Sequence, residues 1–247
     1  MASAMILSTL IVHAVPSRSE EATVNGFYQR GGPSLSQKWR GADYVAASKA
    51  LLPAQGDLPR FNDTSGGAII QHLTAQQNLE FYRDTSVPAE ARFADFVAFN
   101  QGWVGILQAY ARKHDSGAVS DPELAQAMVF TLQATAAEMD LLGEYWPQIP
   151  KHVSESRKVA DRDLIYSGVT HVLNGAVTTL IDPNSGMNHT ELFGVLKALA
   201  EALPHTKPAL SDEFRAALRQ RIESVRKSFP EPDAQARVAA MESQLDP

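Results

Sequence analysis

Histidines and carboxylates are the side chains of this chain that could transfer protons or bind a metal. The seven histidines are scattered at positions 13, 72, 114, 152, 171, 189 and 205. Metal sites in helical bundles need ligands one turn apart, as in Glu-x-x-His or His-x-x-x-His, and neither pattern occurs. The chain has no cysteine, which excludes thiol nucleophiles, zinc ribbons and iron–sulfur clusters. We therefore expect no metal and no cofactor.

Nucleophile and phosphate motifs are also missing from the sequence. There is no Gly-x-Ser-x-Gly elbow, and the run Asp63-Thr64-Ser65-Gly66-Gly67 lacks the lysine of a P-loop. An enzyme built on this chain would need its acid and base from separate segments. His72 and Glu80, which step at helical spacing with Gln76, and His171 are the first candidates. A solvated helix face explains His72 and Glu80 more simply.

A row of neutral polar residues is the main candidate for a binding site. Ser167, His171, Asn174 and Thr178 follow one another at three- and four-residue spacing, so they share one face of a predicted helix. On a buried helix such groups must be satisfied by neighbouring helices, water or a ligand, which favours a lined cavity. The alternative is that the hydroxyls bond to carbonyls of their own helix and that His171 and Asn174 pair with backbone nearby.

A second candidate interrupts an apolar stripe. Asn100 stands where the stripe of Phe96, Trp103 and Leu107 calls for an apolar residue, and Trp103 lies one turn away. Together Asn100 and Trp103 could offer a small ligand a hydrogen bond and an aromatic wall. The alternative is a core asparagine that ties two helices together.

The elements that must position these residues are helices. With 44% hydrophobic and 20% charged residues the chain is typical of a globular protein, and its apolar periodicity is helical. We predict an all-α, multi-helix bundle of about seven helices with an irregular N-terminal arm. Caps and breakers place the helices at 64–83, 88–113, 120–143, 154–181, 188–203, 211–229 and a last short stretch near 238–245.

Three runs without any charged residue indicate which helices are central. Residues 96–111, 124–137 and 164–181 contain no Asp, Glu, Lys or Arg, although a surface helix nearly always carries them. We expect these three helices inside the bundle. The organisation predicted is a possible signal peptide at 1–15, an irregular arm with one short helix at 16–63, and a single helical domain at 64–247.

The N-terminal segment bears on the compartment. An apolar run over residues 4–12, followed by small residues, resembles a signal-peptide core and its cleavage site, so we expect a periplasmic or secreted protein. A buried N-terminal strand or helix in a cytoplasmic protein is the alternative. Residues 164–181 are long enough to span a bilayer, but their polar side chains disfavour insertion, so no stable membrane span is expected.

The net charge and the missing motifs limit the classes of function that this chain can have. A net charge of −6 argues against a nucleic-acid partner, because binding to a phosphate backbone requires an excess of Lys and Arg. We expect an exported, non-catalytic helical-bundle protein that binds a protein partner or a small molecule. An enzyme of hydrolase or lyase type is one alternative, and a membrane-active protein is a second.

Overall fold

The computed structural model describes residues 24–52, 58–63, 66–115, 121–150 and 152–246, and these are helical with no strand among them. The predicted all-α bundle is therefore confirmed. The predicted signal-peptide segment and the predicted caps at 64–65 and 120 lie outside the described residues. The α-helices are α1 (Val24–Gln29), α2 (Gly41–Leu51), α3 (Gly66–Leu73), α4 (Glu80–Arg83), α5 (Ala89–Asp115), α6 (Asp121–Tyr145), α7 (Glu155–Ile181), α8 (His189–Thr206), α9 (Asp212–Val225) and α10 (Pro232–Gln244). Short 3-10 turns cover Gln76–Leu79, Trp146–Gln148 and Lys207–Ala209.

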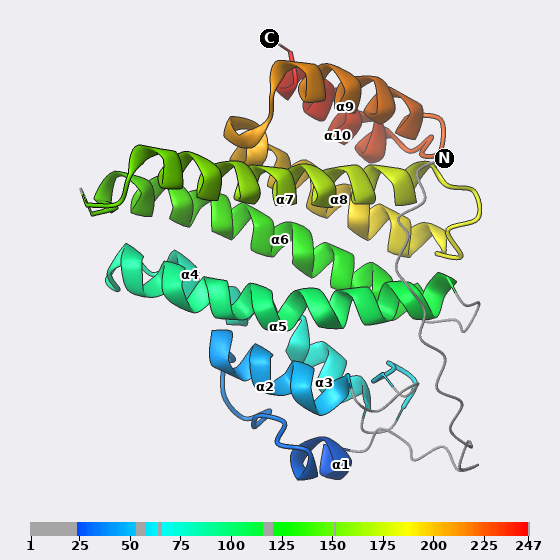
Figure 1. The fold of residues 1–247 in the computed structure, drawn as a ribbon. Helices are drawn as coiled ribbons and strands as arrows, with labels where there is room; N and C mark the ends of the chain where they lie inside the picture. Colours follow the sequence, from blue (N-terminus) through cyan, green and yellow to red (C-terminus); the bar gives the residue numbers. More distant parts are fainter. Residues whose placement is uncertain (1–23, 53–57, 64–65, 116–120, 151, 247) are drawn as a thin grey trace, which may run out of the picture.

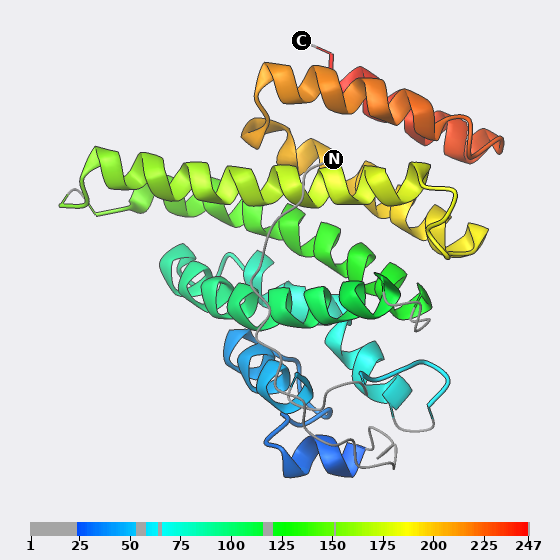
Figure 2. The same cartoon turned by 45° about the vertical axis from the view of Figure 1, so that its right-hand side comes forward.

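The helices are stacked in layers. Figures 1 and 2 show α1 to α3 at one end, α5 and α6 in the middle, α7 and α8 beyond them, and α9 with α10 at the other end. Helix α6 crosses between α5 on one side and α7 with α8 on the other. It packs against α5 and most extensively against α8, and α5 packs in turn against α2.

Helix α6 belongs to two hydrophobic cores. Phe130 and Leu141 point into the first core, which the N-terminal helices build with the aromatic rings of Tyr44 and Trp103. Leu132 and Leu142 belong to the second core, which α7 to α10 complete. Because apolar partners cover both sides of α6, residues 124–137 have no face that needs charge. This uncharged run is central, as predicted.

The other two uncharged runs are only partly covered. In α7 Leu164 is 74% exposed, and in α5 Val104 is 46% exposed. Within these two runs the exposed faces lack charge, so the missing charge reflects an apolar outer face rather than complete burial. The prediction that 164–181 is enclosed is therefore wrong. The run 96–111 lies between α2 and α6 but also leaves one face open, and the open faces of both runs line the groove described below.

Several predicted helix starts are confirmed by their caps. Ser154 accepts a hydrogen bond from the backbone N–H of Arg157 at 3.3 Å. Asn188 and Glu191 form a reciprocal capping box at the start of α8, and Ser211 caps α9. Two ends differ: α8 continues through Pro204 to Thr206, and α9 ends at Val225. A proline in the last turn removes only one helical hydrogen bond, which the helix end tolerates.

The helix predicted over 64–83 is broken into α3, a 3-10 turn and α4. The carbonyls of His72 and Leu73 accept bonds from the side chains of Asn78, at 2.8 Å, and Tyr44, at 2.7 Å. These tertiary bonds replace part of the helical ladder after Leu73. Helical periodicity cannot reveal such a break, because it registers apolar spacing and not competing side-chain donors.

The segment predicted as an irregular arm carries two helices, α1 and α2, within the described residues. Phe27, Trp39 and Tyr44 are fully buried in the first core. The backbone N–H of Trp39 donates to Asn78 Oδ1 at 2.9 Å. Burial of three large aromatic side chains fixes this segment to the body, although its Gly- and Pro-rich composition favours loops.

Candidate functional site

An open groove of about 830 Å³ lies between α5 and α7, with α6 as its floor. We call it the α5–α7 groove. Its walls include the exposed apolar side chains Val97, Val104 and Leu164, together with Ile165. The volume falls within the range of small-molecule sites, about 300–1,000 Å³. The uncharged faces of α5 and α7 are therefore the walls of this groove.

Glu138 is the distinctive group of the groove. It follows the uncharged run of α6, is partly buried, and its Oε1 accepts a hydrogen bond from Asn100 Nδ2 of α5 at 3.1 Å. Desolvation raises the pKa of the Glu138 carboxyl to about 7, although the bond from Asn100 opposes the rise. In the part of the chain that the structure describes, no Lys, Arg or His forms an ion pair with Glu138.

Aromatic side chains supply much of the groove lining. Trp103 is 2% exposed, and its Nε1 donates to Thr131 Oγ1 of α6 at 3.0 Å. Phe93 of α5 stacks on Tyr145 of α6 with their ring centroids 4.6 Å apart. Trp103 is thus almost wholly covered, and the partly buried rings of Phe93 and Tyr145 supply aromatic surface to the groove. Aromatic ring faces attract cations.

The basic residues at the α7 rim are already paired with acids. Arg157 and Lys158 line the groove, as does Asp161. Arg157 bonds Asp161 at 2.9 Å, and Lys158 bonds Glu155 at 2.8 Å. These neighbouring pairs cancel each other's charge, which leaves the Glu138 carboxylate as the unbalanced group of the lining.

A second hollow of about 460 Å³ adjoins the groove. The two share Leu107, Thr131, His171 and Val172. Beyond these shared residues the second hollow is lined mainly by apolar side chains, including Met128 and Met187, with polar groups such as Asp182 and Ser185.

No protein-family model, no curated protein and no solved structure matches this chain. Its function therefore has to be inferred from the geometry of its own side chains.

The polar row predicted on α7 lies on an exposed face. Ser167, His171, Asn174 and Thr178 are all exposed, and His171 Nδ1 lies 2.7 Å from the carbonyl of Ser167. Thr178 Oγ1 donates to the carbonyl of Asn174, the self-bonding alternative for such hydroxyls. Arg221 of α9 donates to Asn174 Oδ1 and to Thr178 Oγ1. The row therefore lies on the outer face of α7, where Asn174 and Thr178 bond to α9.

The structure distributes the predicted binding residues over several places. Asn100 and Trp103 line the α5–α7 groove, His171 lines both hollows, and Thr178 lines the second. Ser167 lines a separate shallow hollow beside Pro208, and Asn174 lines neither the groove nor the second hollow. Asn100 also ties α5 to α6 through its bond to Glu138, which is the alternative interpretation, and its contact with a ligand stays a prediction.

His72 and Glu80 are not brought together with His171. His72 packs on Trp39 with ring centroids 4.8 Å apart, and burial lowers the pKa of its imidazole. Glu80 is exposed and pairs with Lys38 at 2.5 Å. Helices α5 and α6 separate this region from α7 (Figure 1). Among the described residues no group of three or more His, Asp or Glu is placed to hold a metal ion.

Sequence reasoning missed Glu138. A glutamate at the end of an uncharged run resembles an ordinary solvated residue, so it was not selected. The available signal was the spacing of Thr131, Thr135 and Glu138, which puts three polar groups on one face of a central helix. Their partners, Trp103 and Asn100, come from α5, and sequence periodicity does not give the register between two helices.

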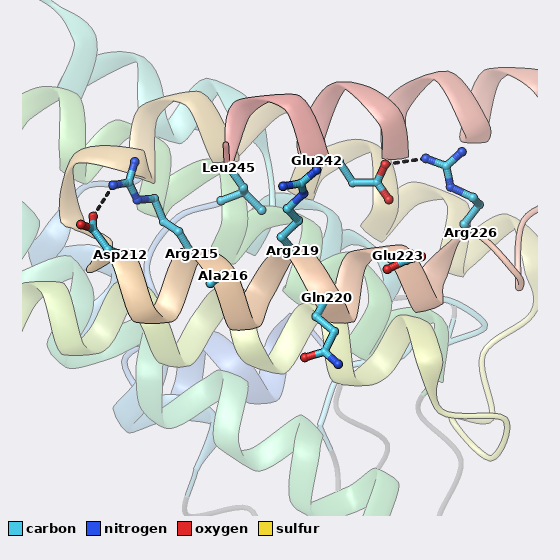
Figure 3. A pocket seen from close by; sticks show the side chains of 9 residues that line it. All are labelled: Asp212, Arg215, Ala216, Arg219, Gln220, Glu223, Arg226, Glu242 and Leu245. Atoms are coloured by element: carbon cyan, nitrogen blue, oxygen red, sulfur yellow. Dashed lines mark hydrogen bonds and ion pairs between the residues drawn. The ribbon is translucent and has the colours of Figure 1, made fainter. Parts of the chain in front are cut away.

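Another groove, of about 660 Å³, lies between α9 and α10 and is lined by three arginines (Figure 3). Each arginine has an acidic partner: Arg215 pairs with Asp212, Arg219 with Asp246 and Arg226 with Glu242. Figure 3 shows the first and last of these pairs. Because the charges balance, this groove lacks the excess of positive charge that an anion site needs.

Helix α7 is the one described helix that is long and apolar enough by composition to cross a bilayer. In its most apolar stretch 28% of the residues are buried. Length and composition alone are weak grounds for a membrane span, because core helices of soluble proteins meet the same criteria. The exposed part of α7 contributes one wall of the α5–α7 groove.

Proposed function

We propose that this protein is a non-catalytic binding protein that holds a small apolar molecule bearing a cationic group in the α5–α7 groove. The observation that carries the proposal is the Glu138 carboxyl, which lies among apolar and aromatic walls and has no ion-pair partner among the described residues. A desolvated carboxylate gains most from a ligand that brings its own positive charge.

The lining supports a ligand with an apolar body as well as a charge. Val97, Val104 and Leu164 would lose their contact with water when the groove is filled. Each buried methylene contributes about 0.8 kcal/mol, so shape and apolar area would supply most of the affinity. The ring faces around the groove favour a soft cation such as a quaternary ammonium.

Calorimetric titration with benzyltrimethylammonium tests the proposal. At pH 8 the wild type should bind, and Glu138→Gln should weaken binding about tenfold or more, because the attraction between the carboxylate and the cation is lost. Neopentylbenzene, in which carbon replaces the charged nitrogen, should bind both proteins equally. Glu213→Gln removes an exposed carboxylate from α9 and is the matched control. Equal binding of the cation to wild type and Glu138→Gln would refute the proposal.

Acid–base catalysis at Glu138 is a second candidate. A carboxyl with a pKa of about 7 is half ionised near neutral pH, the condition under which general acids and bases work best. Mass spectrometry of the bound molecule after incubation separates the two functions. A binding protein returns its ligand unchanged, whereas an enzyme converts it at a rate that Glu138→Gln abolishes.

Export remains part of the proposed function. The apolar run at residues 4–12 supports a leader that is removed during secretion. The intact mass of the protein recovered from its native host tests this directly: a mature chain that starts near Val15 agrees with export, and a mass that retains residues 1–14 contradicts it.

A further inference from the structure

The α5–α7 groove and the second hollow adjoin each other along α7, and we call the two together the path. They meet at Leu107, Thr131, His171 and Val172, and both have α6 as floor and α7 as wall. Glu138 lies in the first part only, and the second part contributes methionine and leucine side chains, which adapt to flexible apolar guests. The path thus has a polar attachment point at one place and an apolar extension beyond it.

Two glycines of α7 leave room along this path. Gly168 lines the groove and Gly175 lines the second hollow, two helical turns further on. A Cβ atom at either position would meet no other atom within 4 Å. Gly102 of α5 is the contrast, because a Cβ there would overlap the backbone of Tyr44. Close helix packing accounts for Gly102, whereas Gly168 and Gly175 border open space.

The charges along the path agree with a single cationic end. Glu138 has no ion-pair partner among the described residues, whereas Arg157 and Lys158 at the α7 rim are paired with acids. Asp161 is engaged with Arg157. Asp182 of the second hollow also has no ion pair among the described residues, but it is exposed at the C-terminal end of α7, and its Oδ1 accepts a hydrogen bond from the backbone N–H of Asn184.

We infer that the ligand is a single-chain cationic amphiphile, whose headgroup contacts Glu138 and whose alkyl chain passes Leu107 and Val172 into the second hollow. The inference rests on the proposed function and adds the class of ligand. A compact cation would fill only the groove, and a membrane surface could not enter a path between two helices.

Alkyltrimethylammonium ions of increasing length test the inference. Butyl, octyl and dodecyl compounds are titrated into the full chain at pH 8, below their micelle-forming concentrations. If the alkyl chain of the ligand enters the second hollow, the affinity should keep rising from octyl to dodecyl, by up to about fourfold for each added methylene. Far-UV circular dichroism checks that the folded state persists during each titration.

Substitutions at three glycines show where the alkyl chain of the ligand lies. Gly175→Phe should remove the gain from octyl to dodecyl and leave butyl binding unchanged, whereas Gly168→Phe should weaken all three. Gly143→Phe is the matched control, because Gly143 is an exposed helical glycine on α6 with no atom near its Cβ position and lines neither hollow. Gly175→Leu provides a second, smaller block if the phenylalanine variant does not fold.

The outcomes separate this inference from the proposed function. Equal affinity for octyl and dodecyl, or unchanged dodecyl binding in folded Gly175→Phe and Gly175→Leu, overturns the amphiphile and leaves a compact cation in the groove. Failure of every ammonium ion to bind, benzyltrimethylammonium included, overturns the proposed function and the inference together. Binding only to zwitterionic lipid vesicles, with no binding of monomers, also overturns the inference.

Discussion

At the residue scale the properties of the candidate site depend on one carboxyl. Glu138 has apolar and aromatic neighbours in the groove, and the only compensation visible among the described residues is the amide of Asn100. A carboxylate in such surroundings opposes folding more strongly than a neutral carboxyl does. Its pKa of about 7 lies above the unfolded value, so the folded state binds more protons between these two values.

The first prediction concerns stability and pH. The stabilisation that protonated Glu138 gives is fully present below about pH 4.5 and is lost as pH rises through about 7. Glu138→Gln has no charge to desolvate and can still accept the bond from Asn100. Urea unfolding should find Glu138→Gln more stable than wild type by about 2 kcal/mol at pH 8, with the difference vanishing near pH 4. Identical pH profiles would contradict the desolvated carboxyl.

The second prediction concerns ligand affinity and pH. Benzyltrimethylammonium keeps its charge at every pH, so changes in its affinity report on the protein. The other charged groups lining the groove, which are Arg157, Lys158, Asp161 and His171, remain in the variant. Wild-type affinity should fall by at most about tenfold for each unit below pH 7 as Glu138 takes up a proton, until it reaches the affinity of Glu138→Gln. In Glu138→Gln this pH dependence of the affinity should disappear. If the affinity of the variant still changed with pH, another titratable group would be responsible.

At the element scale the structure depends on how closely α5 approaches its neighbours. Gly102 lets the backbone of α2 pass directly against α5. In the first turn of the same helix, Arg92 is buried and donates to the carbonyls of Tyr82 and Val87, both at 2.9 Å, and to Glu144 of α6. These contacts fix α5, and with it Asn100 and Trp103, relative to the floor of the groove.

The third prediction compares two helical glycines. Gly102→Ala should lower the free energy of unfolding by about 2 kcal/mol, because the added methyl group forces α2 away from α5. Gly143→Ala should raise it by about 0.5–1 kcal/mol, since alanine is the better helix former and open space surrounds that position. Chemical denaturation measures both. A stabilising Gly102→Ala would show that α2 and α5 are not in close contact.

Much of the element pattern could be predicted from sequence, because caps and periodicity are local signals. Ser154, Asn188 and Ser211 mark their helix starts as expected. The break after Leu73 could not be predicted, since it depends on bonds from Tyr44 and Asn78. The uncharged runs of α5 and α7 were recognised as unusual, but only the arrangement of the helices distinguishes a covered face from the wall of a groove.

At the scale of the whole molecule, α6 joins two cores that would otherwise be separate. Leu141 faces the first core and Leu142 the second, although they are adjacent in the chain. A helix shared in this way makes each half depend on the other, because neither core is complete without it. We expect the described helices to unfold as one cooperative unit.

The fourth prediction tests that coupling. Leu141→Ala and Leu142→Ala should each cost about 2–5 kcal/mol, and each should lower the midpoint of a single thermal transition. Differential scanning calorimetry should give equal calorimetric and van't Hoff enthalpies for both variants. If the two substitutions shifted two different transitions, the cores would be independent folding units and the groove between α5 and α7 could open without unfolding.

Carbon-13 NMR of the Glu138 side-chain carboxyl, with Glu138→Gln to assign the signal, tests directly whether this carboxyl is desolvated and binds cations. We expect a titration midpoint near 7 in the free protein. Saturating benzyltrimethylammonium should lower the midpoint, because a bound cation favours the ionised form. A midpoint near the ordinary glutamate value of about 4.3, unchanged by the cation, would contradict a desolvated carboxylate that binds cationic ligands.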